Sequence, residues 1–472
     1  MSNKNLLSGR DKELQELAEQ YEAAMAGNKP FYQDADELAD LADWYGTKKR
    51  YDKAFEIAEY GLKLHPDSTE LMIEYAYLHL DNGKKAKARE IIENLPDTYS
   101  PEAKVVRAHL LLSEGKLDDA EQLLDTIEDK DDLANVVDVS YMYLDMGYPD
   151  KALAWLDPVK EEYEEAYIAV VADCLYGKGM TEEAIPLYNR LIDMNPYSAP
   201  YWFGLARCHF EEMNFNQAID ACDYALVSDD EFADAYVMKG HCFYQLGNED
   251  AALEYYQKAE ELHGLAPEFI YTYIGLCKVS KGEWKEGYEN LEKAILENET
   301  DEVASPILPS LYANAGLCLS KMGKKRKAHQ YCKKAHKLSP EDPESLLIEG
   351  RIYIEEGDYD KGIKQWAKAL NCSPTADTWN EIGMHSMEIG YLDYAKIAFE
   401  RVCELEPNFD GINEKLTVLY MTLHDKENFI KYNQKCPRPF DLKELEKMQM
   451  LMESEDREDL AAYMQNIIKA LQ

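Results

Sequence analysis

The sequence of 472 residues lacks any long apolar run. No stretch approaches the roughly 20 consecutive apolar residues that a membrane-spanning helix requires. Residues 1–15 contain no apolar segment of the kind found in a secretory signal. We therefore predict a cytoplasmic protein and do not expect a membrane among its partners.

The sequence also lacks the short motifs that accompany common enzyme chemistries. It has no H-E-x-x-H zinc motif, no G-x-S-x-G nucleophile turn, no G-x-x-x-x-G-K-[ST] phosphate loop and no glycine-rich dinucleotide motif. Neighbouring carboxylates such as Glu161 and Glu162 are common, but helix surfaces of an acidic protein produce such pairs without catalysis. We predict that the chain is not an enzyme and requires no cofactor.

Basic residues are scarce relative to acidic ones. The chain has 51 Lys and Arg against 91 Asp and Glu, a formal net charge of -40. Proteins that bind nucleic acid depend on clustered Lys and Arg to neutralise phosphates, so DNA and RNA are disfavoured as partners. A basic or neutral protein or peptide is the expected partner. The alternative, that the acidic charge serves only solubility, stays open.

Glycine and proline are also few, at 24 and 18 residues. Hydrophobic residues make up 46% of the chain and charged residues 30%. This composition is typical of a folded helical protein rather than a disordered one.

A repeated pattern organises the chain, and residues 379–407 show it most completely. The marker residues of that unit are Trp379, Ile382, Gly383, Gly390, Leu392, Ala395, Phe399 and Pro407. With Trp379 counted as position 4, eleven units follow one another along the sequence. Their turns fall at residues 49, 83, 115, 147, 179, 213, 247, 282, 323, 357 and 390. Three successive steps between turns are only 32 residues long, which predicts tighter loops between those repeats.

Two positions of the repeat are small in every unit. Position 8 is Ala42, Ala76, Ala108, Ser140, Ala172, Ala206, Gly240, Gly275, Gly316, Gly350 and Gly383. Position 20 is Ala54, Ala88, Ala120, Ala152, Ala184, Ala218, Ala252, Gly287, Ala328, Gly362 and Ala395. Two helices approach closely only where side chains are small, so we predict a helix crossing at these positions.

Nine of the eleven turns carry glycine, which adopts a left-handed backbone without a Cβ clash. Lys49 and Met213 occupy the other two turns. The alternation of helix, turn and helix leaves no place for strands.

This pattern resembles the tetratricopeptide repeat, a helix-turn-helix unit of about 34 residues with W-x2-L-G, A-x3-F and a closing proline. The resemblance implies an all-α fold, a right-handed superhelical solenoid of antiparallel helix pairs. Each pair buries its apolar side against its neighbours, so the array needs no separate globular cores. The family's usual role implies a protein that binds other proteins.

We divide the chain on this basis into five parts. They are an N-terminal capping helix and linker (1–34), repeats one to eight (35–297), an acidic and proline-containing insertion (298–309), repeats nine to eleven (310–407), and a degenerate repeat with C-terminal capping helices (408–472). The insertion is either a hinge between two lobes or a loop within one rigid array. The methionine-rich helices near the C-terminus either cap the array or join copies of the chain into a homo-oligomer.

In the family, positions 2, 5, 9, 12 and 13 of the first helix line a concave groove. Transferred to repeats two to seven, these positions give the predicted partner-binding residues Tyr77, His109, Tyr141, Asp173, Tyr176, Phe203, Arg207, Phe210, His241 and Tyr244. Aromatic side chains supply a large contact area, which suits an extended peptide or an amphipathic helix. The alternative is that these tyrosines only pack between repeats.

The predicted function is a scaffold or adaptor that binds a peptide segment or helix of a partner in this groove. One alternative is a regulatory receptor, in which a small peptide or metabolite changes the curvature of the solenoid. Another is a structural subunit that assembles permanently through its outer face.

Some relatives bind a C-terminal carboxylate with a set of Lys, Asn and Arg on successive repeats. Here Asn314 and Arg351 are isolated matches, and Glu344 occupies a place that should be basic or an amide. A receptor of that type is therefore disfavoured. The only sizeable basic run, Lys321 to Lys337, is interpreted as a solvated helix face paired with neighbouring acids.

Ten cysteines are present without a C-x2-C pair, so a structural zinc site is not expected. Five of them recur at position 10 of consecutive repeats, namely Cys174, Cys208, Cys242, Cys277 and Cys318. Cysteines one repeat apart are too distant for a disulfide, so we predict free, buried thiols and no bound metal.

Overall fold

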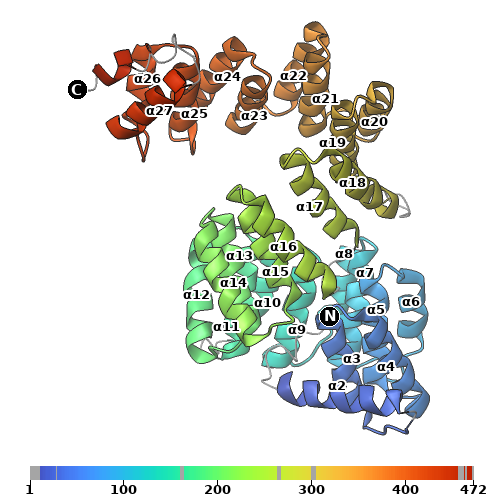
Figure 1. Ribbon diagram of the computed structural model, residues 1–472. Coiled ribbons are helices and arrows are strands. Elements are labelled where there is room, and N and C mark those ends of the chain that lie inside the picture. Colours follow the sequence, from blue (N-terminus) through green and yellow to red (C-terminus); the bar gives the residue numbers. More distant parts are fainter. Residues whose placement is uncertain are drawn as a thin grey trace. The chain divides into compact units, whose positions relative to one another are not determined.

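A computed structural model describes residues 11–27, 29–159, 164–262, 267–298, 305–454, 462 and 465–469. Within these ranges the chain is entirely helical and contains no strand, as predicted (Figure 1). It divides into two compact units, unit 1 (Met1–Cys277) and unit 2 (Lys278–Gln472).

Unit 1 is built from antiparallel helix pairs that follow one another along the chain (Figure 1). After α2 (Asp11–Ala26) the pairs are α3 (Ala35–Thr47) with α4 (Tyr51–Leu64), α5 (Thr69–Asp81) with α6 (Lys85–Glu93), α7 (Pro101–Ser113) with α8 (Leu117–Leu124), α9 (Leu133–Asp145) with α10 (Pro149–Leu156), α11 (Glu165–Gly177) with α12 (Thr181–Met194), α13 (Ala199–Glu211) with α14 (Phe215–Ser228), and α15 (Ala233–Gln245) with α16 (Glu249–Glu261). Helix α17 (Pro267–Ser280) runs across the division between the units.

Unit 2 continues the same plan. Its helices are α18 (Trp284–Asn298), α19 (Leu308–Lys321), α20 (Lys325–Leu338), α21 (Pro343–Glu355), α22 (Tyr359–Cys372), α23 (Ala376–Glu388), α24 (Leu392–Leu405), α25 (Ile412–Thr422), α26 (Lys426–Asn433) and α27 (Leu442–Ser454). Residues 299–304 of the proposed hinge lie outside the described residues, so the hinge stays a prediction. Most of the last C-terminal helix also lies outside the described residues, so it too stays a prediction.

The two small positions of the repeat face each other inside a pair. The Ser140 hydroxyl at position 8 donates a hydrogen bond to the Ala152 carbonyl at position 20, with 3.1 Å between the oxygens. In another repeat, a Cβ added to Gly350 would lie 3.0 Å from the Gly362 carbonyl oxygen. Larger side chains at these positions would push the two helices apart. The predicted crossing is confirmed.

The nine turn glycines all have positive φ angles. Lys49 and Met213, which replace glycine in two turns, adopt the same backbone with φ of 58°. A left-handed backbone costs a residue with a Cβ about 1 kcal/mol. The turn geometry is therefore imposed by the packing of the pair, and glycine is only its least strained occupant. His424 has the same φ angle, which places a twelfth turn in the degenerate repeat.

The three short steps have a different cause from the one predicted. The second helices α6, α8 and α10 contain only 9, 8 and 8 residues, against 14 in α12 and α14. The loops that follow them are not tighter, because residues 94–100 connect α6 to α7 whereas residues 195–198 suffice between α12 and α13. Shortened outer helices, not short loops, reduce the spacing.

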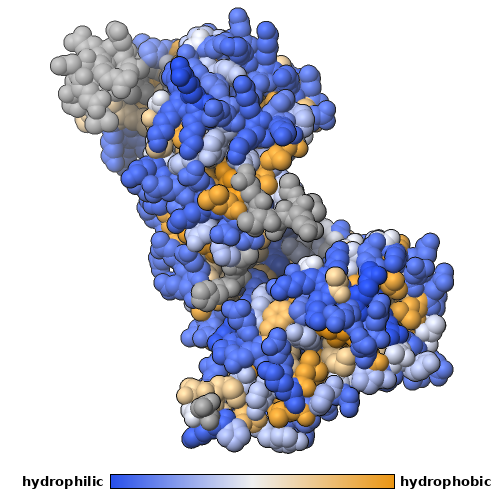
Figure 2. Space-filling view, turned by 90° about the vertical axis from the view of Figure 1, so that its right-hand side faces the viewer, coloured by the Kyte–Doolittle hydropathy of each residue, from blue (hydrophilic) through white to orange (hydrophobic). Residues whose placement is uncertain are grey.

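The core passes from one pair to the next. One cluster of buried side chains joins helices α11 to α15, from Ile168 to Ala235, and so spans three repeats. At the N-terminal end, α2 buries Leu14, Ala18 and Tyr21 against the first pair. The surface seen in Figure 2 is mostly hydrophilic, with smaller apolar areas between, in keeping with the acidic composition.

Two ion pairs join distant repeats within unit 1. Lys48 Nζ lies 2.8 Å from Asp229 Oδ2, and Lys49 Nζ lies 2.5 Å from Asp234 Oδ1. The lysines belong to the turn between α3 and α4, while the aspartates lie at the start and just beyond the end of the loop from α14 to α15. We call these two pairs the clasp. The clasp links the first repeat to the sixth and seventh.

Candidate functional site

The ten predicted binding residues lie on the first helices of their pairs, from α5 to α15. Each of these helices contacts the first helix of the next pair, α5 with α7, α7 with α9, and onward to α13 with α15. Among the helices described, successive second helices contact each other less than successive first helices do. Because the first helices are closer together, unit 1 curves with them on its inner side. We call this surface the inner face of unit 1.

The centre of the inner face is the carboxylate of Asp173 on α11. Tyr141 on α9 donates its hydroxyl proton to Asp173 Oδ2 over 3.3 Å, and Tyr188 on α12 donates to Oδ1 over 2.6 Å. Arg207 Nη2 on α13 lies 2.8 Å from the same Oδ1. Charge-assisted hydrogen bonds from three surrounding helices hold this carboxylate in place.

The Arg207 guanidinium is also stacked against aromatic rings. Its Cζ lies 4.4 Å from the centre of the Tyr176 ring and 5.6 Å from that of Phe203. The nearby tyrosine hydroxyls and Asp173 favour the charged guanidinium and raise the pKa of Arg207, although burial acts in the opposite direction. Five predicted residues, Tyr141, Asp173, Tyr176, Phe203 and Arg207, are thus brought into one cluster.

Two other groups of predicted residues stand apart from that cluster. Tyr77 on α5 packs against His109 on α7, with ring centres 5.7 Å apart. Burial lowers the pKa of His109 to about 4, so this histidine is neutral at pH 7. Phe210 lies beside His241, with ring centres 6.3 Å apart. Tyr244 is half-buried on α15.

His241 makes further contacts that the sequence did not predict. Its Nδ1 is 2.7 Å from the hydroxyl of Tyr256 on α16, and its ring centre is 4.4 Å from that of Tyr273 on α17. Burial lowers the pKa of His241 to about 4. Tyr188 and Tyr256 were missed because they belong to second helices, whereas the predicted groove positions were taken only from first helices.

The inner face is electronegative near Tyr77. Burial, followed by the charges of Asp138, Glu74, Asp145 and Asp81, raises the pKa of the Tyr77 hydroxyl. Asp81 itself is exposed to solvent, yet surrounding protein desolvates it enough to raise its pKa. A carboxylate that is both exposed and partly desolvated is expected on a concave surface, where water reaches it from one side only.

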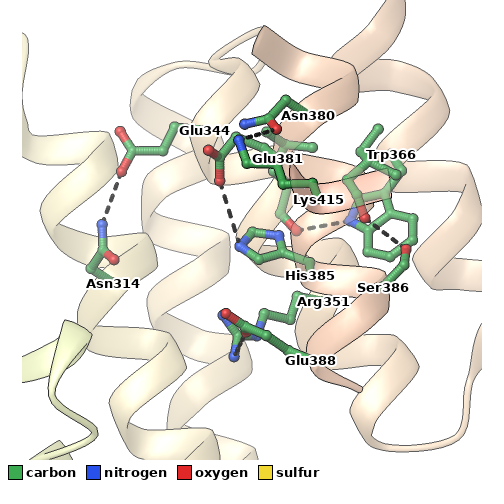
Figure 3. A network of polar contacts seen from close by, with 12 residues as sticks. Asn314, Glu344, Arg351, Trp366, Asn380, Glu381, His385, Ser386, Glu388 and Lys415 are labelled. Carbon is green, nitrogen blue, oxygen red and sulfur yellow. Dashed lines mark hydrogen bonds and ion pairs between the residues drawn. The ribbon is translucent and has the colours of Figure 1, made fainter. Parts of the chain in front are cut away.

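The inner side of unit 2 carries a different, polar network (Figure 3). Asn314 Nδ2 on α19 donates to Glu344 Oε1 on α21 over 3.1 Å. Arg351 Nη2 on α21 lies 2.8 Å from Glu388 Oε2 on α23. Asn314 and Arg351, which the sequence presented as isolated residues, both have acidic partners. The Arg351 guanidinium is therefore already paired within the chain.

His385 lies within the same network, with its Nε2 3.9 Å from Glu381 Oε2 (Figure 3). Burial first, and then the charge of Arg351, lowers the pKa of His385 to about 3. Burial raises the pKa of Glu381. Lys415 Nζ donates to Asn380 Oδ1 over 2.8 Å, and burial lowers the pKa of Lys415.

The five cysteines at position 10 are fully buried and none of them forms a disulfide, as predicted. Burial raises the pKa of the Cys174, Cys208, Cys242 and Cys318 thiols, so these four thiols are protonated at pH 7. Among the residues that the structure describes, no group of His, Cys, Asp or Glu side chains is arranged to hold a metal ion. No described helix is long and apolar enough to cross a membrane.

Three family models match parts of the chain. Tetratricopeptide repeat models match residues 47–110 and 309–342, and a model described as anaphase-promoting complex, cyclosome, subunit 3 matches residues 177–259. None of the three describes a catalytic domain. Together with the helix pairs and their small crossing residues, these matches show that the chain is a tetratricopeptide repeat protein.

Individual relatives are distant. The chain is 23% identical over 306 residues to the BBSome complex member BBS4 of Bos taurus, a match that covers 56% of this chain and 58% of the relative. It is 22% identical over 205 residues to DnaJ homolog subfamily C member 7 of Homo sapiens, covering 42% of this chain and 41% of the relative. The matches thus span less than two thirds of these relatives. A solved structure, the APC/C hetero-tetramer Cut9-Hcn1, is 18% identical with a TM-score of 0.47, covering 87% of this chain and 83% of that one.

Proposed function

We propose that the protein is a non-enzymatic scaffold or adaptor whose unit 1 binds a peptide segment or helix of a partner on its inner face. The half-buried rings of Tyr176, Phe203 and Phe210 offer apolar contact area there. One relative and one matching family model bear names of protein complexes, the BBSome and the anaphase-promoting complex, which agrees with a role in protein interaction.

The observation that carries the proposal is the set of carboxylates around Tyr77. Four carboxylates raise the pKa of the Tyr77 hydroxyl through their charge, Glu74 and Asp81 on α5 and Asp138 and Asp145 on α9. Such a surface attracts Lys and Arg side chains and repels acidic ones. The partner segment is therefore expected to be basic, with apolar residues that reach the aromatic rings.

A peptide library displayed against the intact chain tests this function. Peptides rich in Arg or Lys with interspersed aromatic residues should be enriched. The double substitution Asp81→Asn and Asp145→Asn changes exposed side chains and should weaken a selected peptide about tenfold, because losing two ionic contacts removes about 1.4 kcal/mol. Asp118→Asn with Asp119→Asn, on the second helix α8, is the matched control. Enrichment of acidic peptides, or equal binding to both double variants, would reject the proposal.

The regulatory receptor is a second candidate, and the clasp favours it. Two ion pairs between repeats far apart in sequence give unit 1 a contact that a bound ligand could break by changing the curvature. The ligand in that case is a small peptide or metabolite. Labels across the clasp would report such a change directly when ligand is added.

A further inference from the structure

Helix α20, a second helix of unit 2, carries a row of cations without partners. Its apolar side, Ala328, Cys332 and Ala335, is buried. Within the described part of the chain, five neighbouring cations make no ion pair, side-chain hydrogen bond or ring contact. They are Lys324, Lys325, Arg326, Lys333 and Lys337.

The remaining cations of this basic run are engaged. Lys321 Nζ lies 2.9 Å from Glu355 Oε1, and Lys327 Nζ donates to the Tyr288 hydroxyl over 2.5 Å. Lys334 Nζ donates to the hydroxyl of Tyr312 over 3.0 Å. Lys327 Nζ also lies 3.6 Å from Glu292 Oε1, so the expectation of pairing with neighbouring acids is met by Lys321 and Lys327, but not by the five unpaired residues.

Four of the unpaired cations point in similar directions. Successive residues of an α-helix are about 100° apart, so Lys325, Lys333, Arg326 and Lys337 fall within an arc of about 120°. All four are exposed. We call them the basic face of α20.

This arrangement weakens the helix that carries it. The first turn of α20 contains no acidic residue, although the helix dipole favours negative charge there, and it begins instead with Lys325 and Arg326. Lys333 and Lys337 are like charges four residues apart, which costs roughly 0.2–0.5 kcal/mol. Lys337 lies in the last turn, where the helix dipole favours a cation, but Lys325 and Arg326 in the first turn have no acidic partner among the described residues, so an external anion is the group that the basic face would complement.

We propose that the basic face of α20 docks a short acidic segment of a partner protein. The helix is about 21 Å long, which matches about six residues of extended chain. Packing of Ala328, Cys332 and Ala335 fixes the spacing of the cations, so the segment meets a rigid row of charges. This docking surface lies on a second helix and is separate from the inner face proposed to bind a basic peptide.

The charge of the remaining chain limits the length of the ligand. The run from Lys321 to Lys337 contributes eight positive charges and no acid. Because the net charge of the whole chain is -40, all other residues together carry a net charge of -48. A ligand that extends well beyond the basic face meets the rest of the chain, whose net charge is negative and repels it. DNA, RNA and anionic membranes extend in this way, whereas a short acidic peptide does not.

Binding to the intact chain can be measured by fluorescence anisotropy with a labelled hexaglutamate peptide at about 50 mM NaCl. We expect saturable binding that weakens as salt is raised. The triple variant Arg326→Glu, Lys333→Glu and Lys337→Glu should weaken binding at least about tenfold. These side chains are exposed, so the circular dichroism spectrum should not change.

The matched control is the triple variant Lys53→Glu, Lys87→Glu and Lys258→Glu, which alters net charge equally at partly exposed lysines of unit 1, each of which pairs with a glutamate on its own helix. It should reduce binding no more than about twofold, the loss expected from long-range charge alone. A DNA duplex of about 20 base pairs and vesicles containing phosphatidylserine are the competing probes. Equal losses in both triple variants, no binding to the native chain, or tighter binding of DNA or vesicles than of the peptide would overturn the proposal.

Discussion

Reversing the two lysines of the clasp should open unit 1. In the variant Lys48→Glu with Lys49→Glu, both ion pairs are lost and two carboxylates are placed against Asp229 and Asp234. Because the clasp joins repeats so far apart in sequence, its loss should increase the distance between its two sides while each helix pair stays folded.

The magnitude follows from the exposure of the four side chains, which ranges from 19% to 32%. Partly exposed ion pairs contribute about 0.2–1 kcal/mol each. Reversal adds a repulsion of about 1 kcal/mol per pair at 4 Å in water. The total change is therefore about 2–4 kcal/mol, enough to move a clasp that is mostly closed to one that is mostly open. At about 0.5 M salt the screening length falls to about 4 Å, so salt should partly mimic the variant.

Spin labels on exposed residues beside the clasp would measure the distance by electron spin resonance. Cysteines introduced at Asp52 and Glu231 are suitable, with the exposed Cys372 replaced by Ser. Adding Asp229→Lys and Asp234→Lys to the reversed variant should restore the native distance. An unchanged distance in the reversed variant would refute the reasoning and show that repeat packing alone sets the curvature.

Two further predictions concern stability. Gly240→Ala should lower the free energy of unfolding by about 1 kcal/mol. The new Cβ would lie 2.5 Å from Tyr256 Cε1. This overpacking costs about 1–3 kcal/mol, while the higher helix propensity of alanine recovers about 1 kcal/mol. Gly177→Ala, whose Cβ meets nothing closer than 3.7 Å, should be neutral or stabilising in the same urea titration, and similar losses in both would contradict this account. His109 has a folded pKa of about 4, below its ordinary 6.5, so the unfolded chain takes up the proton first as pH falls. The contribution of neutral His109 to the free energy of unfolding is fully present above pH 6.5, and at pH 5.5 it should be smaller by about 1 kcal/mol. The variant His109→Gln should therefore show a weaker dependence of unfolding free energy on pH in this range.

The repeat itself could be predicted from the sequence because its geometry depends on local features. Small residues at positions such as Ser140 and Ala152 must face each other wherever two helices cross closely, so their spacing alone reveals the pair. The turns were predictable for the same reason. Lys49 shows the limit of the glycine rule, because packing imposes a positive φ on a residue that does not favour it.

The candidate site was predicted less completely. Tyr256 reaches His241 from a second helix, and it can do so because Gly240 leaves room for its ring. A glycine at position 8 with an aromatic residue at position 24 was a usable signal that first-helix positions alone did not include. The clasp between Lys48 and Asp229 had no such signal, because it depends on the twist accumulated over all the intervening repeats.

The shortened outer helices α6, α8 and α10 have a mechanical consequence. Helices of 8 or 9 residues are marginal without tertiary support, and a linear array is only as strong as its weakest neighbouring interfaces. Under tension applied at the two ends of unit 1, extension should begin in the second to fourth repeats once the clasp, which bridges them, has opened. These three repeats should therefore unfold at a lower force than the flanking repeats, which keep their structure while the second to fourth repeats extend.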